Sequence, residues 1–320
     1  MSAAPVVCLP GSPATRGTAR LLRRGRAREP GSVSQSISEG TRHSLHLIMV
    51  GWGYAKANGP STWPAMFPVA GGSKQSPIDI KRRGCPEDSR LSKMRAAYAD
   101  IRISELSNSG HSWKAQIGSG RSSKPARGPL GDDEYVLEQF HPHWGKTNER
   151  GSEHTIDGTC YPAELHLVHW NKSKFSSFAQ AAASEGGLAV LGMFLAVGQE
   201  HPEMSKICNL LPFINYKGQA ITVTDAVRPE TFLPKNGSYY TYSGSLTTPP
   251  CYESVTWIVF EQPIQVSEAQ LDAFRRLKSY HPCEDCPQDE LQGALVENYR
   301  PPCPLCDRVV RKYSDKEEEE

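Results

Sequence analysis

The sequence predicts a mainly β fold of the α/β class with a few peripheral helices. Residues 164–169 alternate with a period of two, which is typical of a half-buried strand. Residues 188–197 and 254–260 are apolar and rich in β-branched side chains, and their lengths favour buried strands. Between Trp52 and about Tyr313 the sequence has no linker long enough to divide the chain and no internal repeat. These strands are therefore expected to form one domain.

Two helices are expected at the periphery. Ser267 and Gln270 have the spacing of a capping box, and Val266 with Leu271 has that of a hydrophobic staple, so a helix should begin just after Ser267. Leu271, Phe274 and Leu277 then form its buried stripe. A second helix is expected over residues 177–183.

Composition excludes several classes of protein. The 320 residues contain 36 Lys+Arg and 35 Asp+Glu, giving a formal net charge of +1. This balance argues against nucleic-acid and membrane-surface partners. The longest apolar run, residues 188–197, is too short to span a bilayer. The cysteines number nine, which is odd, and are unevenly spaced, so they do not indicate a secreted disulfide framework.

Both ends of the chain differ from the middle. Residues 1–48 contain seven arginines, two glutamates and no periodic pattern, so this segment is expected to be a disordered extension. Its composition resembles that of a mitochondrial transit peptide, but the preferred interpretation is that Met49 is the natural start of the protein. A secretory signal peptide is disfavoured because no apolar segment follows the basic residues. Residues 49–313 form the predicted domain, and 314–320 form an acidic tail expected to be solvated.

A histidine pattern predicts a metal site. His141 and His143 are two residues apart, and side chains at this spacing share a face only on a strand. His166 lies in the next strand-like run, where a returning chain would bring it close to the pair. Three imidazoles with one open position is the arrangement of catalytic zinc, although histidines in the core or on the surface are the alternative. Gln139 and Glu164 each precede a candidate ligand by two residues, so each can accept that ligand's second N–H.

At this point the chain resembles a known family, the α-class carbonic anhydrases. The resemblance extends over about 260 residues, with the matching segments in family order. They are Trp52-Gly-Tyr54, Asn58-Gly-Pro60, Gln75-Ser-Pro-Ile-Asp-Ile80, His141-Pro-His-Trp-Gly145, Gly151-Ser-Glu-His-Thr155, Ala163-Glu-Leu-His-Leu-Val-His-Trp-Asn171, Leu188-Ala-Val-Leu-Gly192, Tyr242-Ser-Gly-Ser-Leu-Thr-Thr-Pro-Pro250, Val255-Thr-Trp257 and Asn298-Tyr-Arg-Pro301. The run Thr248–Ser254 looks closest to invertebrate cytosolic members.

The resemblance implies a single domain around a twisted, mostly antiparallel sheet of about ten strands. It also implies a zinc-dependent enzyme, a carbonate dehydratase, that converts CO₂ reversibly to bicarbonate and a proton through a zinc-bound hydroxide. The implied zinc ligands are His141, His143 and His166. Gln139 would orient His141, and Glu164 would orient His166. The carbonyl of Asn298 would hold His143. The alternative is a catalytically silent, carbonic-anhydrase-related binding module, which should lack a ligand histidine.

The same resemblance implies roles around the metal. Thr247 would orient the attacking hydroxide and donate a hydrogen bond to Glu153, while His111 would shuttle the proton and Tyr54 would order the connecting waters. The substrate-binding positions implied for CO₂ are Val168, Val190, Leu246, Thr248, Val255 and Trp257. His154 and His169 are expected to be structural histidines rather than ligands.

Cysteines bear on compartment and on a second site. Secreted relatives have a disulfide between an early cysteine and a cysteine just after the Thr-Thr-Pro-Pro segment. In this chain Cys251 occupies the second of these positions, but the first is Ala70, so the disulfide cannot form. This favours a reducing, cytoplasmic location, with a mitochondrial location as the alternative. Cys283-x-x-Cys286 and Cys303-x-x-Cys306 have the spacing of a four-cysteine zinc site. Four reduced thiols, or a disulfide, are the competing interpretations.

The protein is expected to be a monomer.

Overall fold

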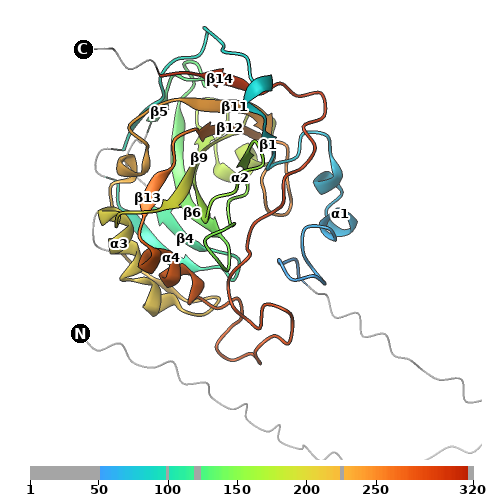
Figure 1. The fold of residues 1–320 in the computed structure, drawn as a ribbon, viewed down its shortest axis with the longest axis vertical. Coiled ribbons are helices and arrows are strands. Elements are labelled where there is room, and N and C mark those ends of the chain that lie inside the picture. The colour runs from blue at the N-terminus through green and yellow to red at the C-terminus, as the bar shows by residue number, and fades with distance from the viewer. Residues whose placement is uncertain (1–50, 99–100, 119–123, 224–226, 316–320) are drawn as a thin grey trace, which may run out of the picture. The chain divides into compact units, whose positions relative to one another are not determined.

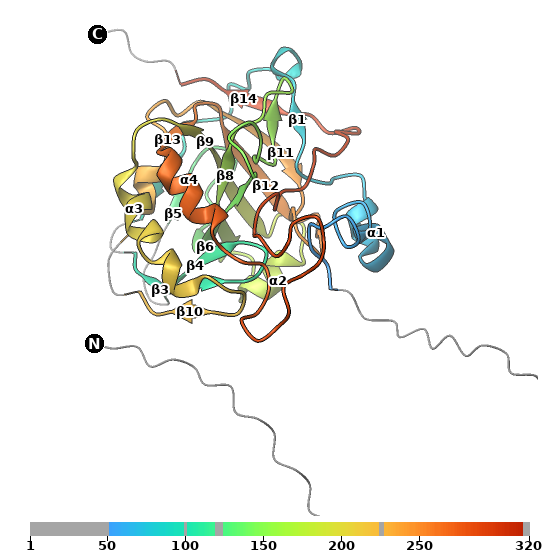
Figure 2. The ribbon, with the colours of Figure 1, turned by 60° about the horizontal axis from the view of Figure 1, so that its bottom comes forward.

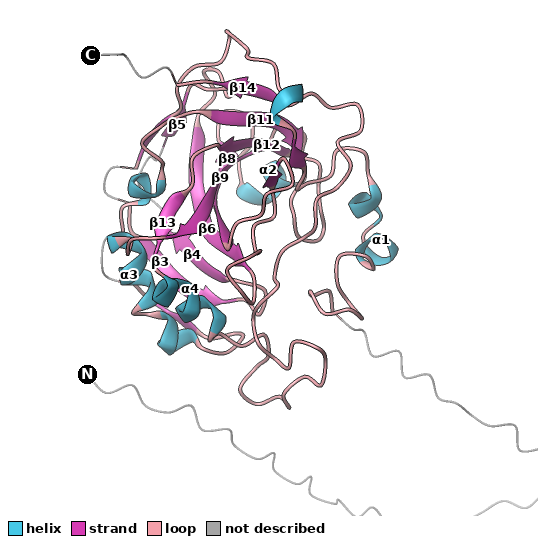
Figure 3. Cartoon of the chain, viewed as in Figure 1, coloured by secondary structure: helices cyan, strands magenta, loops and turns pink. Residues whose placement is uncertain are grey.

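One large sheet organises the protein. The computed structural model describes residues 51–98, 101–118, 124–223 and 227–315, so the extension predicted for residues 1–48 lies outside the described residues. Strands dominate and helices lie at the periphery (Figure 3). Ten strands form the large sheet, in the order β10-β3-β4-β6-β8-β9-β12-β11-β14, with β13 paired to β9 (Figure 1). The predicted fold class is therefore confirmed.

The sheet is mostly antiparallel, and its parallel pairs are β9 with β12 and β9 with β13. Two-stranded pairs β1–β7 and β2–β5 lie outside it. In chain order the strands are β1 (Asp79–Ile80), β2 (Arg95–Ala97), β3 (Ile103–Asn108), β4 (Trp113–Ile117), β5 (Lys124–Ala126), β6 (Tyr135–Trp144), β7 (Thr155–Ile156), β8 (Ala163–Asn171), β9 (Leu188–Val197), β10 (Ala220–Ile221), β11 (Tyr239–Gly244), β12 (Val255–Phe260), β13 (Ile264–Val266) and β14 (Arg311–Tyr313).

The helices are short. They are α1 (Trp63–Met66), α2 (Phe178–Ala182), α3 (Pro202–Cys208) and α4 (Glu268–Arg275), with 3₁₀ turns η1 (Pro68–Gly71), η2 (Arg82–Gly84), η3 (Leu211–Ile214) and η4 (Pro229–Phe232). Figure 2 shows α3 and α4 side by side and α1 on the opposite side of the sheet. None of these helices is long and apolar enough to cross a bilayer.

The predicted start of α4 is confirmed. Ser267 accepts a hydrogen bond from the Gln270 backbone N–H, and the Gln270 side chain accepts one from the Ser267 N–H. Such a cap stabilises a helix by about 1 kcal/mol. Leu271 and Phe274 are buried on the helix, whereas Leu277 is buried just beyond its end.

The two faces of β8 carry different chemistry. Leu165 and Leu167 belong to the larger hydrophobic core, which extends to α3 and α4. Val168 belongs to a second cluster on the other face, together with side chains of β9, β11 and β12. His166 alternates with the leucines and therefore lies on the same face as Val168. The sheet thus separates an apolar core from the face that carries the histidine.

The beginning of the predicted acidic tail is held to the domain. The Ser314 hydroxyl donates to Glu87, and Asp315 forms an ion pair with Lys93 at 2.6 Å. The Asp315 backbone N–H also donates to the Ser238 hydroxyl. The solvated tail that the sequence predicted therefore begins no earlier than residue 316, which lies outside the described residues.

Candidate metal centre

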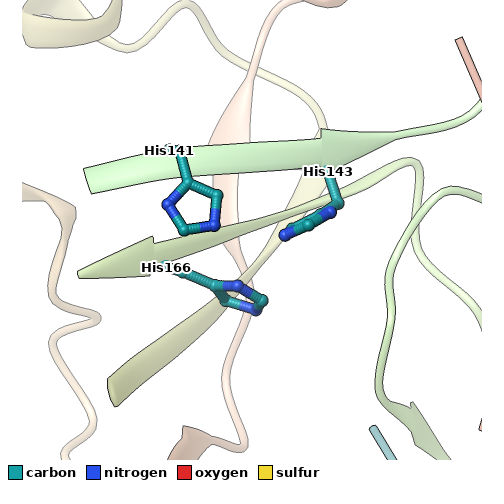
Figure 4. Close-up of side chains that lie close together, drawn as sticks. All are labelled: His141, His143 and His166. Atoms are coloured by element: carbon teal, nitrogen blue, oxygen red, sulfur yellow. The ribbon is translucent and has the colours of Figure 1, made fainter. Parts of the chain in front are cut away.

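Three histidines converge from two neighbouring strands. His141 and His143 lie on β6 and share a face, because side chains two apart on a strand point the same way. His166 on β8 is the direct cross-strand partner of His141. The three rings point toward one another (Figure 4), with centroid separations of 4.8 to 5.5 Å. Their ligand nitrogens lie within 4.8 Å of one another, close enough to hold one metal ion.

Each imidazole is fixed through one of its two nitrogens. His141 Nδ1 lies 2.8 Å from Gln139 Oε1, and His143 Nδ1 lies 2.7 Å from the carbonyl oxygen of Asn298. His166 uses its other nitrogen, because Nε2 donates to Glu164 at 2.7 Å. The nitrogens left to face a metal are therefore Nε2 of His141, Nε2 of His143 and Nδ1 of His166.

Burial keeps the three rings neutral, as metal ligation requires. Desolvation lowers the pKa of His143 to about 3, with a further contribution from His166. It also lowers the pKa of His166, and it lowers that of His141 well below the ordinary value. Neutral imidazoles can offer their lone pairs to a cation at neutral pH.

The donor set fits zinc. The Nε2 atom of His143 is fully buried and has no hydrogen-bond partner among the residues the structure places. Burying such an atom without a partner is unfavourable unless a ligand meets it. Three neutral imidazoles with their second nitrogens held by protein acceptors are the ligand set of a catalytic zinc site.

Glu164 is the centre of a buried hydrogen-bond network. Its Oε1 accepts from His166 and, at 2.7 Å, from His154 Nδ1, while its Oε2 accepts the backbone N–H groups of Glu153 and His154. Burial alone would raise the pKa of Glu164, but the two imidazoles bring it well below its ordinary value. The grouping of His154, Glu164 and His166 is therefore explained as a hydrogen-bonded cluster rather than a second metal site.

The network continues to β11. Because His154 Nδ1 donates to Glu164, its Nε2 accepts from the Tyr242 hydroxyl at 2.6 Å. The Tyr242 oxygen lies 2.9 Å from Ser76 Oγ. The expected structural role of His154 agrees with these contacts. His169, on the opposite face, lies 2.9 Å from the Tyr98 hydroxyl and away from the three ligands.

Glu153 lies beside the metal centre. Its Oε1 accepts the backbone N–H of Arg300 at 2.8 Å, and its Oε2 lies 3.4 Å from His143 Nε2. Burial, and then the charge of Glu164, raises the pKa of Glu153 well above its ordinary value; the Thr247 hydrogen bond and Arg300 act in the opposite direction. A bound dication would oppose the rise as well.

An apolar wall flanks the histidines. Val168, Val190, Val255 and Trp257 are buried in one hydrophobic cluster, and Leu246 packs against it half-buried. The Trp257 ring lies 4.8 Å from that of His166. Thr248 is half-buried, and its carbonyl oxygen accepts from the Cys251 N–H at 2.9 Å. The wall therefore reaches the metal ligands through Trp257.

His111 lies under an aromatic side chain. Its ring stacks on Trp52 at a centroid distance of 3.8 Å, and Tyr54 lies edge-on at 6.4 Å. Desolvation, and then the charge of Lys217, lowers the pKa of His111 to about 4. A proton shuttle works best when it titrates near neutrality, so this burial is unfavourable for the role expected of His111. The Tyr54 hydroxyl is buried without a protein hydrogen-bond partner within the described ranges.

The structure does not gather three of the four predicted cysteine ligands within reach of one ion. Among the placed residues, the groups able to hold a metal consist of histidines and Glu164, and no cysteine belongs to them. Cys303 Sγ contacts the Ser76 carbonyl, whereas Cys286 Sγ contacts that of Gln292. Cys283 and Cys306 are exposed. The competing interpretation, four reduced thiols, agrees better with these separate contacts.

Sequence reasoning missed the structural importance of Tyr242 and Arg300. Both lie inside segments that carried the resemblance, but no local pattern distinguishes them. Tyr242 meets a residue 88 positions away, and Arg300 meets one 147 positions away. The only signal was their position in those segments.

Comparison with known proteins agrees with this geometry. A family model described as eukaryotic-type carbonic anhydrase matches residues 58–314. The chain is 41% identical over 261 residues to carbonic anhydrase 7 of Homo sapiens, which covers 82% of this chain and 96% of the relative. It is also 41% identical over 261 residues to carbonic anhydrase 7 of Mus musculus, covering 81% and 96%.

Proposed function

Because the chain belongs to the eukaryotic-type carbonic anhydrase family, and is thus a zinc enzyme for CO₂ + H₂O ⇌ HCO₃⁻ + H⁺, we propose how its residues divide the reaction. The convergence of three neutral imidazoles carries the proposal. Stopped-flow CO₂ hydration, measured with zinc content and with a sulfonamide inhibitor, tests it. An inactive protein with a full complement of zinc would contradict it.

His141, His143 and His166 would hold the zinc. Bound zinc supplies a nucleophile at neutral pH by lowering the pKa of water to about 7, a value known for this family as a whole. Gln139, Glu164 and the Asn298 carbonyl keep each ring in the orientation and tautomer that leave the metal-facing nitrogen unprotonated.

Thr247 and Glu153 would orient the attacking oxygen. When the Thr247 hydroxyl donates to Glu153, its own oxygen is left as an acceptor, which fixes the direction of the proton on the nucleophile. The advantage is one of alignment. Glu153 is itself held by the Arg300 N–H, so the acceptor is prepared before substrate arrives.

The apolar wall would receive CO₂. A small molecule without a net dipole gains little from polar groups. The apolar surface proposed for it is formed by Val168, Val190, Leu246, Val255 and Trp257. Thr248 would complete the substrate-binding positions. Water is excluded there because the cluster is buried.

His111 would export the proton, with Tyr54 ordering the intervening water. Supporting observations are the buried, unpartnered Tyr54 hydroxyl and the position of His111 next to it. With a pKa of about 4 in its stacked position, His111 would have to leave Trp52 to accept a proton efficiently at neutral pH.

A silent binding module is the alternative. Such a protein should have lost a ligand, whereas this chain has all three histidines together with Thr247 and Glu153. Esterase activity at the same site is expected only as a side reaction.

We also propose that residues 49–313 form a monomeric catalytic domain. The protein would be located in the cytoplasm and would have no nucleic-acid or membrane partners. Among its relatives, it would be most similar to invertebrate cytosolic carbonic anhydrases. By the family resemblance, Ala70 and Cys251 stand where secreted relatives have their disulfide, and their shared hydrophobic cluster supports this; an alanine at position 70 precludes the bond. Mapping the mature N-terminus tests the mitochondrial alternative, and light scattering tests the monomer.

A further inference from the structure

Arg300 is a buried cation held by neutral groups. Its side chain is 4% exposed. The guanidinium donates at 2.8 to 2.9 Å to Gln75 Oε1 and to the carbonyl oxygens of Ser76 and Ala70. It also lies 5.6 Å from the centre of the Trp63 ring. Such a multidentate arrangement fixes the backbone position of residue 300, because the planar guanidinium cannot satisfy these contacts from elsewhere.

The backbone of the same residue holds Glu153. The Arg300 N–H donates to Glu153 Oε1 at 2.8 Å, and both groups are buried. A shift of this N–H would leave a buried carboxylate oxygen without its donor, which is costly. The orientation of Glu153 therefore depends on where the guanidinium is anchored.

The anchor reaches the Thr247 turn from both sides. Gln75, which accepts from Arg300, donates to the Cys251 carbonyl at 3.2 Å, and the Cys251 N–H donates to the Thr248 carbonyl. Ser76, whose carbonyl also accepts from Arg300, donates its backbone N–H to Ser245 Oγ at 2.9 Å. Ser245 and Cys251 bracket Thr247 in sequence.

We propose that Arg300 is a positioning residue that sets the relation of Thr247 to Glu153. Its backbone N–H directs the carboxylate, while its guanidinium, through Gln75 and Ser76, fixes the turn that carries the hydroxyl. The inference rests on the proposed roles of Thr247 and Glu153.

A double-mutant cycle tests the inference. Arg300→Gln should lower kcat/KM for CO₂ hydration by about 10- to 100-fold, because a misplacement of about 1 Å costs this much. Zinc content should stay at that of the unmodified enzyme. If Arg300 acts through Thr247, then adding Arg300→Gln to Thr247→Ala should lower kcat/KM by less than about threefold more. Multiplicative losses would overturn the inference.

Arg308 provides the matched control. Its side chain also donates to three carbonyl oxygens, those of Leu305, Ser243 and Pro304, and lies 5.4 Å from the Tyr242 ring. It does not contact Glu153. Arg308→Gln should leave kcat/KM within about twofold of the value for the unmodified enzyme. In the double variant with Thr247→Ala, the factor by which kcat/KM falls should equal the product of the factors for the two single variants.

Gln75→Leu tests the connection should Arg300→Gln fail to fold. This variant keeps the cation and removes the bridge to Cys251. It should lower kcat/KM and show the same coupling to Thr247→Ala; unchanged kcat/KM would overturn the inference. If Thr247→Ala alone has no effect, the proposed role of Thr247 fails instead, so the two failures are distinguishable.

Discussion

The Nε2 atom of His143 lies 3.4 Å from Oε2 of Glu153, and within the described part of the chain neither atom has a hydrogen-bond partner. Oε2 of Glu153 also lies 3.9 Å from Nδ1 of His166, so the carboxyl group approaches two of the three nitrogens that are left to face a metal. Glu153 is thereby placed to influence the metal centre without being one of the three ligands.

Zinc should bind once per chain and depend on His166. His166→Ala removes one of three ligands and leaves Glu164 without one of its imidazole donors, so bound zinc and CO₂ hydration should both be lost. Metal analysis of the dialysed protein measures this, with the exposed His281→Ala as control. Retention of stoichiometric zinc by the His166 variant would contradict the assignment.

The four cysteines should not contribute a second zinc. Replacing Cys283, Cys286, Cys303 and Cys306 together with serine should leave the metal content at about one per chain, because the structure places no three of these thiols within reach of one ion. Mass spectrometry under native conditions counts the ions. Two zinc ions in the unmodified chain, falling to one in the variant, would restore the prediction made from spacing.

Thr247→Ala should separate metal binding from rate. The threonine is not a ligand, so zinc content should be unchanged, while kcat/KM for hydration should fall by about 100-fold because the nucleophile loses its alignment. Thr241→Ala, which removes a buried threonine hydroxyl outside the centre, is the control. A Thr247 variant with normal kcat/KM would show that alignment does not limit the reaction.

The proton pathway should respond to the charge of Lys217. Burial and Lys217 together lower the pKa of His111 to about 4, so Lys217→Gln should raise that pKa toward neutrality. A relay with a pKa nearer the working pH transfers protons faster, so turnover in weak buffer at pH 7 should rise. NMR titration of His111 gives the pKa, and stopped-flow kinetics give the rate, with the exposed Lys172→Gln for comparison. No change in either quantity would contradict this.

Removing the imidazole provides a companion measurement. His111→Ala should slow turnover in weak buffer, and added imidazole should restore part of it, since the small molecule can carry the proton in its place. Failure of every buffer to restore turnover would mean that His111 acts structurally.

Stability should fall in acid partly through His169. Desolvation lowers the pKa of this buried histidine from 6.5 to about 4, although hydrogen bonds to backbone carbonyls oppose the change. Between these values the unfolded chain binds more protons, so the contribution is present above pH 6.5 and is lost as pH falls toward 4. Its size is on the order of 3 kcal/mol. Urea unfolding of the zinc-free protein should show a shallower pH slope for His169→Asn; identical slopes would exclude the effect.

Local sequence patterns predicted the elements well. The strand over residues 188–197 matches β9, and the capping residues of α4 are those expected. The shared face of His141 and His143 followed from strand periodicity, and the expected approach of His166 from a neighbouring strand is realised by the β6–β8 register. The stacking of His111 on Trp52 and the brace around Arg300 were not predictable in this way, because they join segments distant in sequence and depend on how the loops pack.

The Asn298 carbonyl that holds His143 is supplied 155 residues after the ligand itself. During synthesis, both ligand-bearing strands are made long before that carbonyl exists. A partly made chain can therefore present three histidines to zinc but cannot lock the middle one in place. High-affinity metal uptake is expected only after nearly the entire domain has been translated, so loading should follow folding rather than guide it.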